Sequence, residues 1–376
     1  MKNIPMVDLK GQYLKIKDKI DSAVIETIES TAYINGPIVR DFSESLENYL
    51  DVKHVIPCAN GTDALQIALM SLSLKPGDEV ICPSFTYVAT AEVISLLGLT
   101  PVMTDVDPDT FNITAEIIKK HITNKTKAIV PVHLYGQSCD MEEILNLANE
   151  FGLFVIEDNA QSLGAKYSFS DGIKKHTGTI GHIGTTSFFP SKNLGCFGDG
   201  GAIFTNNDQI AEKLKLIANH GQETKYYHKI TGCNSRLDSI QAAILNIKLD
   251  YLDEYSFSRG KMANKYDESF SEIAELKTPK RQHNSTHVFH QYTLKVTPEL
   301  RTDLINFLRN SNIPVMIYYP IPLYKQEAFS SYVKSDFIIP NVEYLCKSVF
   351  SLPIHTEVES SSQDFIIQKV KEFFNE

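Results

Sequence analysis

Lys192 stands in a sequence context where a lysine amine could act as a nucleophile. An aromatic segment, residues 187–190 (SFFP), precedes it, and a glycine-rich turn, residues 198–201 (GDGG), follows it. A single lysine is most often a solvated surface charge, but this setting could desolvate the amine and lower its pKa. Ser187, five residues before the lysine, offers a hydroxyl group to a phosphate.

Asp158 ends a short apolar run, residues 154–158 (FVIED), that is typical of a buried strand. In open α/β sheets, ligands collect beyond the carboxyl ends of the strands, so this carboxylate would face a bound ligand. The alternative interpretation is that Asp158 caps the start of the following helical turn. The strand alone does not decide between the two.

A third candidate is the turn Asn60-Gly61-Thr62, which follows an apolar run and opens an apolar helix predicted over residues 64–72. Free backbone N–H groups at a helix start bind phosphate, and a glycine lets the ligand approach the backbone closely. Many strand–glycine–helix turns bind nothing, so this signal is weak alone. The turn matches neither a Walker A loop nor the G-x-G-x-x-G fingerprint of dinucleotide-binding proteins.

Together, a phosphate site, a strand-end carboxylate and a buried lysine are the three contacts that pyridoxal 5'-phosphate requires. One contact serves the phosphate, one the pyridine nitrogen and one the aldehyde carbon. The carboxylate would keep the ring nitrogen protonated, and the lysine would hold the cofactor covalently and then move protons. The combination therefore predicts an enzyme that uses this cofactor.

Between residues 53 and 205, short apolar runs alternate with helical patterns. This alternation predicts a mainly parallel sheet in an α/β fold, and that sheet would position the residues described above. Seven strands are expected, at residues 54–59, 79–83, 102–105, 128–132, 154–158, 185–189 and 201–205. A long helix over residues 238–254 would lead out of a large domain spanning residues 1–250.

A smaller C-terminal α+β domain is predicted over residues 251–376. It would contain strands at residues 288–296 and 315–319, a helix at residues 300–311 and a closing helix at residues 363–374. At 376 residues the chain exceeds what one hydrophobic core usually supports, which also favours two domains.

Composition narrows the class of protein. With a net charge of -10 and no block of basic residues, a nucleic-acid partner is not expected. The polar N-terminal segment and the absence of any apolar stretch near 20 residues predict neither a signal peptide nor a membrane span, so we expect a cytoplasmic protein. The six cysteines lie far apart without metal-ligand spacing, so neither a metal site nor a disulfide framework is expected.

Five motifs in order along nearly the whole chain resemble the DegT/DnrJ/EryC1/StrS family of sugar aminotransferases. These motifs are residues 60–64 (NGTDA), 83–87 (PSFTY), 157–162 (EDNAQS), 187–201 (SFFPSKNLGCFGDGG) and 234–238 (NSRLD). The resemblance implies an aspartate-aminotransferase-like fold of type I, with a seven-stranded, mostly parallel sheet and a smaller C-terminal domain. It also implies pyridoxal phosphate as the cofactor and a nucleotide-linked keto-sugar and glutamate as substrates.

Carried over residue by residue, the resemblance makes Lys192 the residue that binds the cofactor covalently and Asp158 the partner of the pyridine nitrogen. It assigns the remaining cofactor contacts to the ring hydroxyl (Gln161), the phosphate (Gly61, Thr62, Ser187) and the ring face (Tyr87). Tyr87 could equally be a core residue.

The resemblance also implies a homodimer in which Asn234 reaches the phosphate of the neighbouring subunit's cofactor. Arg236 and Tyr319 would then contact the substrate, although Arg236 could instead pair with a nearby aspartate at the surface. Where the family pattern has His-Tyr-Pro beside the nucleotide, this chain has Tyr318-Tyr319-Pro320, which puts that contact in doubt.

The amino-acid sequence at residues 58–62, 86–92 and 219–222 is most similar to that of family members that aminate C3 of a UDP-linked 3-keto-N-acetylglucosaminuronic acid. Amination at C3 of a dTDP-3-keto-6-deoxyhexose, or at C4 as in perosamine synthases, is a close alternative. Some relatives are sugar dehydratases with histidine in place of the lysine, so Lys192 favours amino transfer. A non-catalytic sensor with the same fold remains a further alternative.

Overall fold

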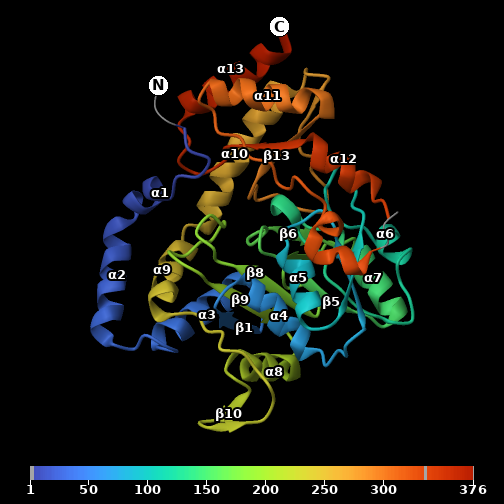
Figure 1. Cartoon of the computed structure of the whole chain (residues 1–376). Coiled ribbons are helices and arrows are strands. Elements are labelled where there is room, and N and C mark those ends of the chain that lie inside the picture. The colour runs from blue at the N-terminus through green and yellow to red at the C-terminus, as the bar shows by residue number, and fades with distance from the viewer. Residues whose placement is uncertain (1–3, 334–336, 376) are drawn as a thin grey trace.

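The computed structural model describes residues 4–333 and 337–375 of the chain. A large sheet with its helices occupies the lower part of the molecule in Figure 1, and a smaller α+β part lies above it. Within the described residues, no helix is both long and apolar enough to cross a membrane.

The central sheet contains the seven strands predicted from the sequence, in the order β1-β9-β8-β5-β4-β2-β3. All neighbours are parallel except β9, which runs antiparallel to both β1 and β8. The strand bounds are β1 His54–Cys58, β2 Glu79–Pro83, β3 Thr100–Thr104, β4 Thr126–Ile129, β5 Phe154–Asp158, β8 Ile183–Ser187 and β9 Gly201–Thr205. They differ from the predicted bounds by three residues at most.

Helices cover both faces of this sheet, which explains why its strands read as continuous apolar runs. Successive residues of β2 enter different cores: Val80 packs with α4, α5 and α8, whereas Ile81 packs with α6 and α7. The bounds are α4 Gly61–Ser71, α5 Ala89–Leu96, α6 Ala115–Lys119, α7 Met141–Phe151 and α8 Asp208–Ala218. Two hairpins extend from this domain, β6 Lys166–Ser168 with β7 Lys174–His176, and β10 Gln222–Thr224 with β11 Tyr227–His228.

The helix expected over residues 238–254 is two helices, α9 Ser239–Leu249 and α10 Leu252–Phe270. The prediction of one helix was wrong because the apolar periodicity continues across the break at Asp250 and Tyr251. The domain boundary near residue 250 stays a prediction, and α10, which follows this break, carries the chain into the smaller part (Figure 1).

The smaller part is built on a three-stranded antiparallel sheet, β12 Leu276–Lys277, β13 Tyr292–Val296 and β14 Val349–Leu352. Its helices are α11 Pro298–Asn310, α12 Pro340–Ser348 and α13 Ser360–Asn375. Two strand predictions need correction. β13 starts at Tyr292 rather than 288, and residues 315–319 form a single bridge, Met316 to Ser351, instead of a strand.

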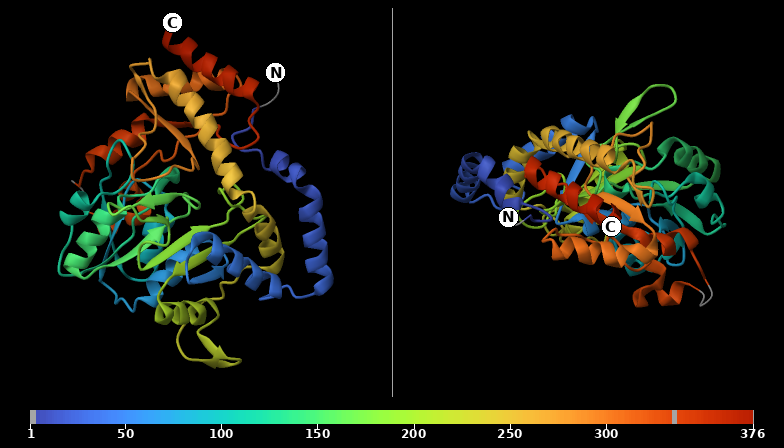
Figure 2. Two further views of the ribbon diagram at one scale, coloured as in Figure 1. Left: turned by 180° about the vertical axis from the view of Figure 1, so that it is seen from behind. Right: turned by 90° about the horizontal axis from the view of Figure 1, so that it is seen from above.

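The two ends of the chain meet at the smaller part. The N-terminal segment leads into α1 Leu9–Lys15, α2 Lys17–Ser30 and α3 Pro37–Leu50, and α2 stands at the periphery of the molecule in both views of Figure 2. Ile4 packs in the core of the smaller part, and the His355 ring contacts the carbonyl of Pro5 at 3.1 Å. The segment around Ile4 and Pro5 thus packs against the smaller part of the molecule.

Candidate active site

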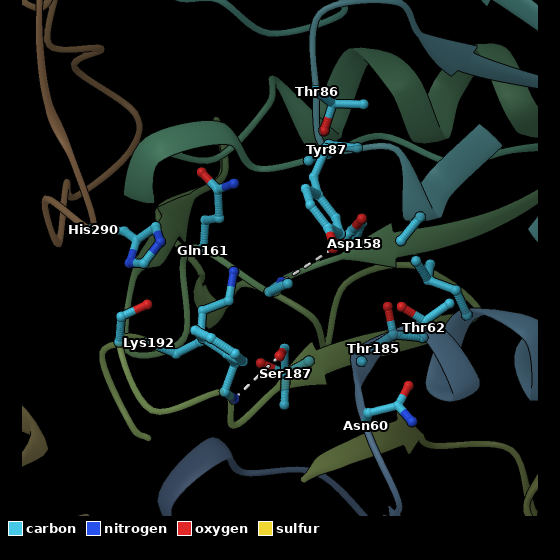
Figure 3. A pocket seen from close by; sticks show the side chains of 18 of the residues that line it. Asn60, Thr62, Thr86, Tyr87, Asp158, Gln161, Thr185, Ser187, Lys192 and His290 are labelled. Carbon is cyan, nitrogen blue, oxygen red and sulfur yellow. Dashed lines mark hydrogen bonds between the residues drawn. The ribbon is translucent and has the colours of Figure 1, made fainter. Parts of the chain in front are cut away.

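A cavity of about 630 Å³ opens at the carboxyl ends of β1, β5 and β8, which are parallel to one another. Its volume lies within the range of small-molecule sites. Eight of the ten residues predicted to form the site line it: Gly61, Thr62, Tyr87, Asp158, Gln161, Ser187, Lys192 and Tyr319. Figure 3 shows Asp158 and Lys192 facing this space from different sides.

Asp158 ends β5 and is 6% exposed, with both carboxylate oxygens directed by neighbours. Thr90 donates its hydroxyl to Oδ2 at 2.9 Å, and the Ala160 backbone N–H donates to Oδ1 at 3.2 Å. Two donors hold the carboxylate in a fixed orientation and leave it lining the cavity. Asp158 therefore combines the two interpretations left open above, since it caps the next turn and also faces the cavity.

Gln161 is held equally firmly. Its Oε1 accepts the Tyr135 backbone N–H at 2.8 Å, and its Nε2 donates to the Tyr319 hydroxyl at 3.0 Å. Tyr135 in turn donates its own hydroxyl to the Tyr318 carbonyl. This chain of hydrogen bonds joins the large domain to the segment that carries Tyr318 and Tyr319.

The start of α4 forms one end of the cavity. Asn60 caps the helix, because its side chain accepts the Asp63 N–H at 2.8 Å. The first N–H groups of the helix, at Gly61 and Thr62, have no partner within the helix, as at every helix start. A Cβ at Gly61 would lie 2.6 Å from Cβ of Ser187, so only glycine keeps the two segments this close. These groups can bind a phosphate.

Lys192 lies in the loop after β8, where its backbone N–H donates to the Phe189 carbonyl at 2.8 Å. Burial of the amine lowers its pKa to about 8, and the nearby Asp158 carboxylate opposes this shift. At such a pKa the amine exchanges readily between its charged and neutral forms near neutral pH. The predicted desolvation of Lys192 is thus present.

Asn234 and Arg236 do not line the cavity of their own chain. Asn234 is exposed, and Arg236 is partly buried. Asn234 bridges to Asn219 at the base of the β10–β11 hairpin, which projects from the bottom of the molecule in Figure 1. Their predicted roles require a second subunit and stay predictions.

Tyr135, Thr90 and His290 are among the residues of the site that the sequence interpretation missed. Tyr135 follows β4, so the rule that strand ends face ligands could have found it. Thr90, one turn beyond Tyr87, gave no signal of its contact with Asp158. His290 comes from the smaller part of the molecule, and no local pattern marks it.

The arrangement can be compared with known proteins. Residues 14–371 match the DegT/DnrJ/EryC1/StrS aminotransferase family. The chain belongs to this family. It is 44% identical over 374 residues to a pleiotropic regulatory protein of Geobacillus stearothermophilus, with 99% of each chain covered.

A second relative is a UDP-2-acetamido-2-deoxy-3-oxo-D-glucuronate aminotransferase of Pseudomonas aeruginosa, 44% identical over 359 residues, with 96% of this chain and 97% of the relative covered. Among solved structures, NtdA from Bacillus subtilis with bound cofactor PMP has a TM-score of 0.92 and 30% identity, covering 100% of this chain and 86% of that one. The fold class, the enzyme class and the cofactor predicted from the sequence are therefore confirmed: this family member is an aminotransferase that uses pyridoxal phosphate.

The residues of the cavity fit this cofactor. Gly61, Thr62 and Ser187 together line one end of the cavity, where only a glycine fits against Ser187, and the N–H groups of α4 that have no partner within the helix lie there too. Gly61, Thr62 and Ser187 would hold the phosphate, Asp158 the ring nitrogen and Lys192 the aldehyde carbon. When bound, the cofactor supplies an electron-withdrawing ring next to the bond that must break. The protein would orient the group and move protons at Nζ of Lys192.

Proposed function

We propose that the protein transfers an amino group from glutamate to C3 of a UDP-linked 3-keto-N-acetylglucosaminuronic acid, for the synthesis of an amino sugar of a surface polysaccharide. The observation that carries the proposal is the cavity that joins Lys192, Asp158 and Gln161, in a chain 44% identical to an aminotransferase named for that sugar. We expect the cytoplasm as its location.

The intact set of site residues separates this proposal from its alternatives. A sensor without turnover has no need for a desolvated amine, an oriented carboxylate and a helix N-terminus in one cavity, although one relative is named a regulatory protein. A dehydratase that carries histidine in place of the lysine is disfavoured by Lys192. Two alternatives, amination of dTDP-linked 3-keto-sugars and amination at C4, differ from the proposed reaction only in the substrate. They are tested by offering the enzyme these substrates directly.

The test incubates the purified protein, pyridoxal phosphate and glutamate with a panel of UDP- and dTDP-linked keto-sugars, and identifies the products by mass spectrometry. We expect amine formation with the UDP-linked uronic acid at a kcat/KM at least about tenfold above that of the other sugars, because an unpaired polar contact in a buried site is costly. Amine formation only with a dTDP-linked or 4-keto sugar would refute the proposed substrate and identify that sugar as the substrate instead. Loss of water without an amine would make the protein a dehydratase.

We further propose that the enzyme is a homodimer with shared active sites. Lys192 is the only lysine or arginine among the described residues that line the cavity, although both proposed substrates are anionic. Tyr226 and Tyr227 at the β10–β11 hairpin are 79% and 74% exposed, and Ile25 and Ile28 on the outlying α2 are exposed as well. Exposed apolar groups of this kind mark interfaces, and a partner's Asn234 and Arg236 would supply the missing polar contacts.

Mixing Lys192→Ala chains with Asn234→Ala chains tests this arrangement. In a shared site the hybrid dimer contains one site with both residues intact, so a 1:1 mixture refolded together should reach about a quarter of wild-type activity. Each variant alone should be impaired, which is the control. Activity that never exceeds the average of the two variants at any mixing ratio would show independent sites.

A further inference from the structure

His290 enters the cavity from the smaller part of the molecule and has no part in the roles assigned above. Its side chain lines the cavity together with Lys192 and Gln161, and Figure 3 shows the ring on the side of the cavity where these two residues lie. The residue is 7% exposed. A buried imidazole at this place can act on the lysine amine.

The backbone that carries His290 is fixed by contacts from three directions. Asn193, next to Lys192, donates its side-chain amide to the Val288 carbonyl at 3.1 Å. The Val288 N–H donates to the Gly136 carbonyl at 2.9 Å. Arg259 of α10 donates Nη1 to the Phe289 carbonyl at 3.1 Å. The ring therefore has a defined position relative to the Lys192 loop.

The surroundings of His290 keep its imidazole neutral. Burial is the main cause that lowers its pKa well below the ordinary value, and the positive charges of Lys192 and Arg259 act in the same direction. No acidic side chain within 4 Å pairs with this histidine in the described part of the chain, and the acids that line the cavity are Asp158 and Asp199. A neutral imidazole carries one N–H donor and one acceptor nitrogen.

The two ring nitrogens have different environments. Nδ1 is fully buried and has no hydrogen-bond partner among the described residues. A proton on Nδ1 would lack an acceptor and would face the field of Arg259, whose Nη1 lies 3.5 Å from the His290 carbonyl. Nε2 is the ring nitrogen left to face the cavity. The proton therefore belongs on Nε2.

We propose that His290 is a positioning residue for Lys192, whose Nε2–H donates a hydrogen bond to the lone pair of the free lysine amine. Both side chains line the same cavity, and the lysine amine is carried on a flexible four-carbon stem, which the proposal requires to turn towards the ring. A donor to the neutral amine favours the base form, whereas the Asp158 carboxylate favours the charged form. His290 thus counteracts Asp158 and holds the amine ready to accept a proton. This inference rests on the proposed role of Lys192.

The test measures the pH midpoint at which Lys192 becomes reactive in the cofactor-free, full-length chain, by trace acetylation with acetic anhydride and peptide mass spectrometry. Two neutral, polar variants distinguish the roles of the two ring nitrogens. The side-chain amide nitrogen of Gln can occupy the place of Nε2, whereas that of Asn reaches only to the place of Nδ1. We expect His290→Asn to raise the midpoint by about 0.5–1 pH unit through loss of one hydrogen bond. His290→Gln should stay within about 0.3 unit of the wild type, well below that change.

His355→Asn is the matched control. His355 is also buried and lies near Arg259, but it contacts the Pro5 carbonyl and does not line the cavity. Its midpoint should equal that of the wild type. The proposal would be overturned if all variants had the same pH midpoint or if the midpoint fell in His290→Asn. It would also be overturned if the midpoint shifted in His290→Gln but not in His290→Asn.

Labelling reports on the amine and not on turnover. A wild-type protein that forms no amino sugar would therefore refute the proposed function and leave these midpoints interpretable. Thermal unfolding followed by circular dichroism shows whether each variant is folded. If the Asn variant is not, His290→Phe, which fills the same space without a donor, should give the same rise in the midpoint, and an unchanged midpoint would overturn the proposal.

Discussion

Lys192→Ala is expected to lower the rate of amino transfer by about 10⁴-fold, because one amine both binds the cofactor and moves protons during the reaction. The variant should also lose the covalent link to pyridoxal phosphate. Borohydride reduction of the wild-type holoenzyme, followed by peptide mass spectrometry, should find the cofactor on Lys192. The same treatment of the variant should find no modified lysine.

Lys248 provides a demanding control for this prediction. It is 1% exposed, donates Nζ to the Gly195 carbonyl at 2.5 Å, and burial lowers its pKa to about 8, as for Lys192. A shifted pKa therefore does not distinguish the two lysines, whereas their positions do, since Lys248 does not line the cavity. Lys248→Met should keep the cofactor on Lys192. Cofactor found on Lys248 in the wild type would refute the assignment.

Much of the central sheet could be predicted because helices cover both of its faces. A doubly covered strand is apolar over most of its length, so β2, β5 and β9 could be predicted from the sequence with their exact bounds. The parallel arrangement then places the ends of β1, β5 and β8 at one edge of the sheet. Asp158 and Ser187 could thus be brought together from the sequence alone.

The smaller part of the molecule was harder to predict because its elements depend on distant contacts. Residues 315–319 look like a strand, yet they pair with β14 through only one bridge. His290 belongs to a predicted strand but lies outside β13, since Arg259 and Asn193 hold the preceding backbone in another path. Contacts of this kind, which join residues about 30 to 95 positions apart, leave no local pattern.

The two acids that end β5, Glu157 and Asp158, differ in their surroundings, and the sequence interpretation did not predict this difference. Successive side chains of a strand point to opposite faces, so Glu157 points away from the cavity that Asp158 lines. Glu157 is fully buried and accepts four hydrogen bonds, from His133 and from the backbone N–H groups of Gly178, Ile180 and Gly181. Since His133 Nδ1 accepts the Cys139 N–H, its Nε2 must be the donor to the carboxylate.

Glu157→Ala is therefore expected to destabilise the protein by about 3–5 kcal/mol, because four buried donors lose their acceptor at once. The thermal midpoint should fall by roughly 4–6 °C, measured by calorimetry at a fixed protein and cofactor concentration. Asp158→Asn is the matched comparison one residue away. Its carboxylate lines the cavity, so the change should cost no more than about 1 kcal/mol of stability while amino transfer falls by at least about tenfold. A Glu157→Ala variant as stable as the wild type would show that other groups accept hydrogen bonds from these donors. It would contradict the conclusion that Glu157 stabilises the fold while Asp158 serves the reaction.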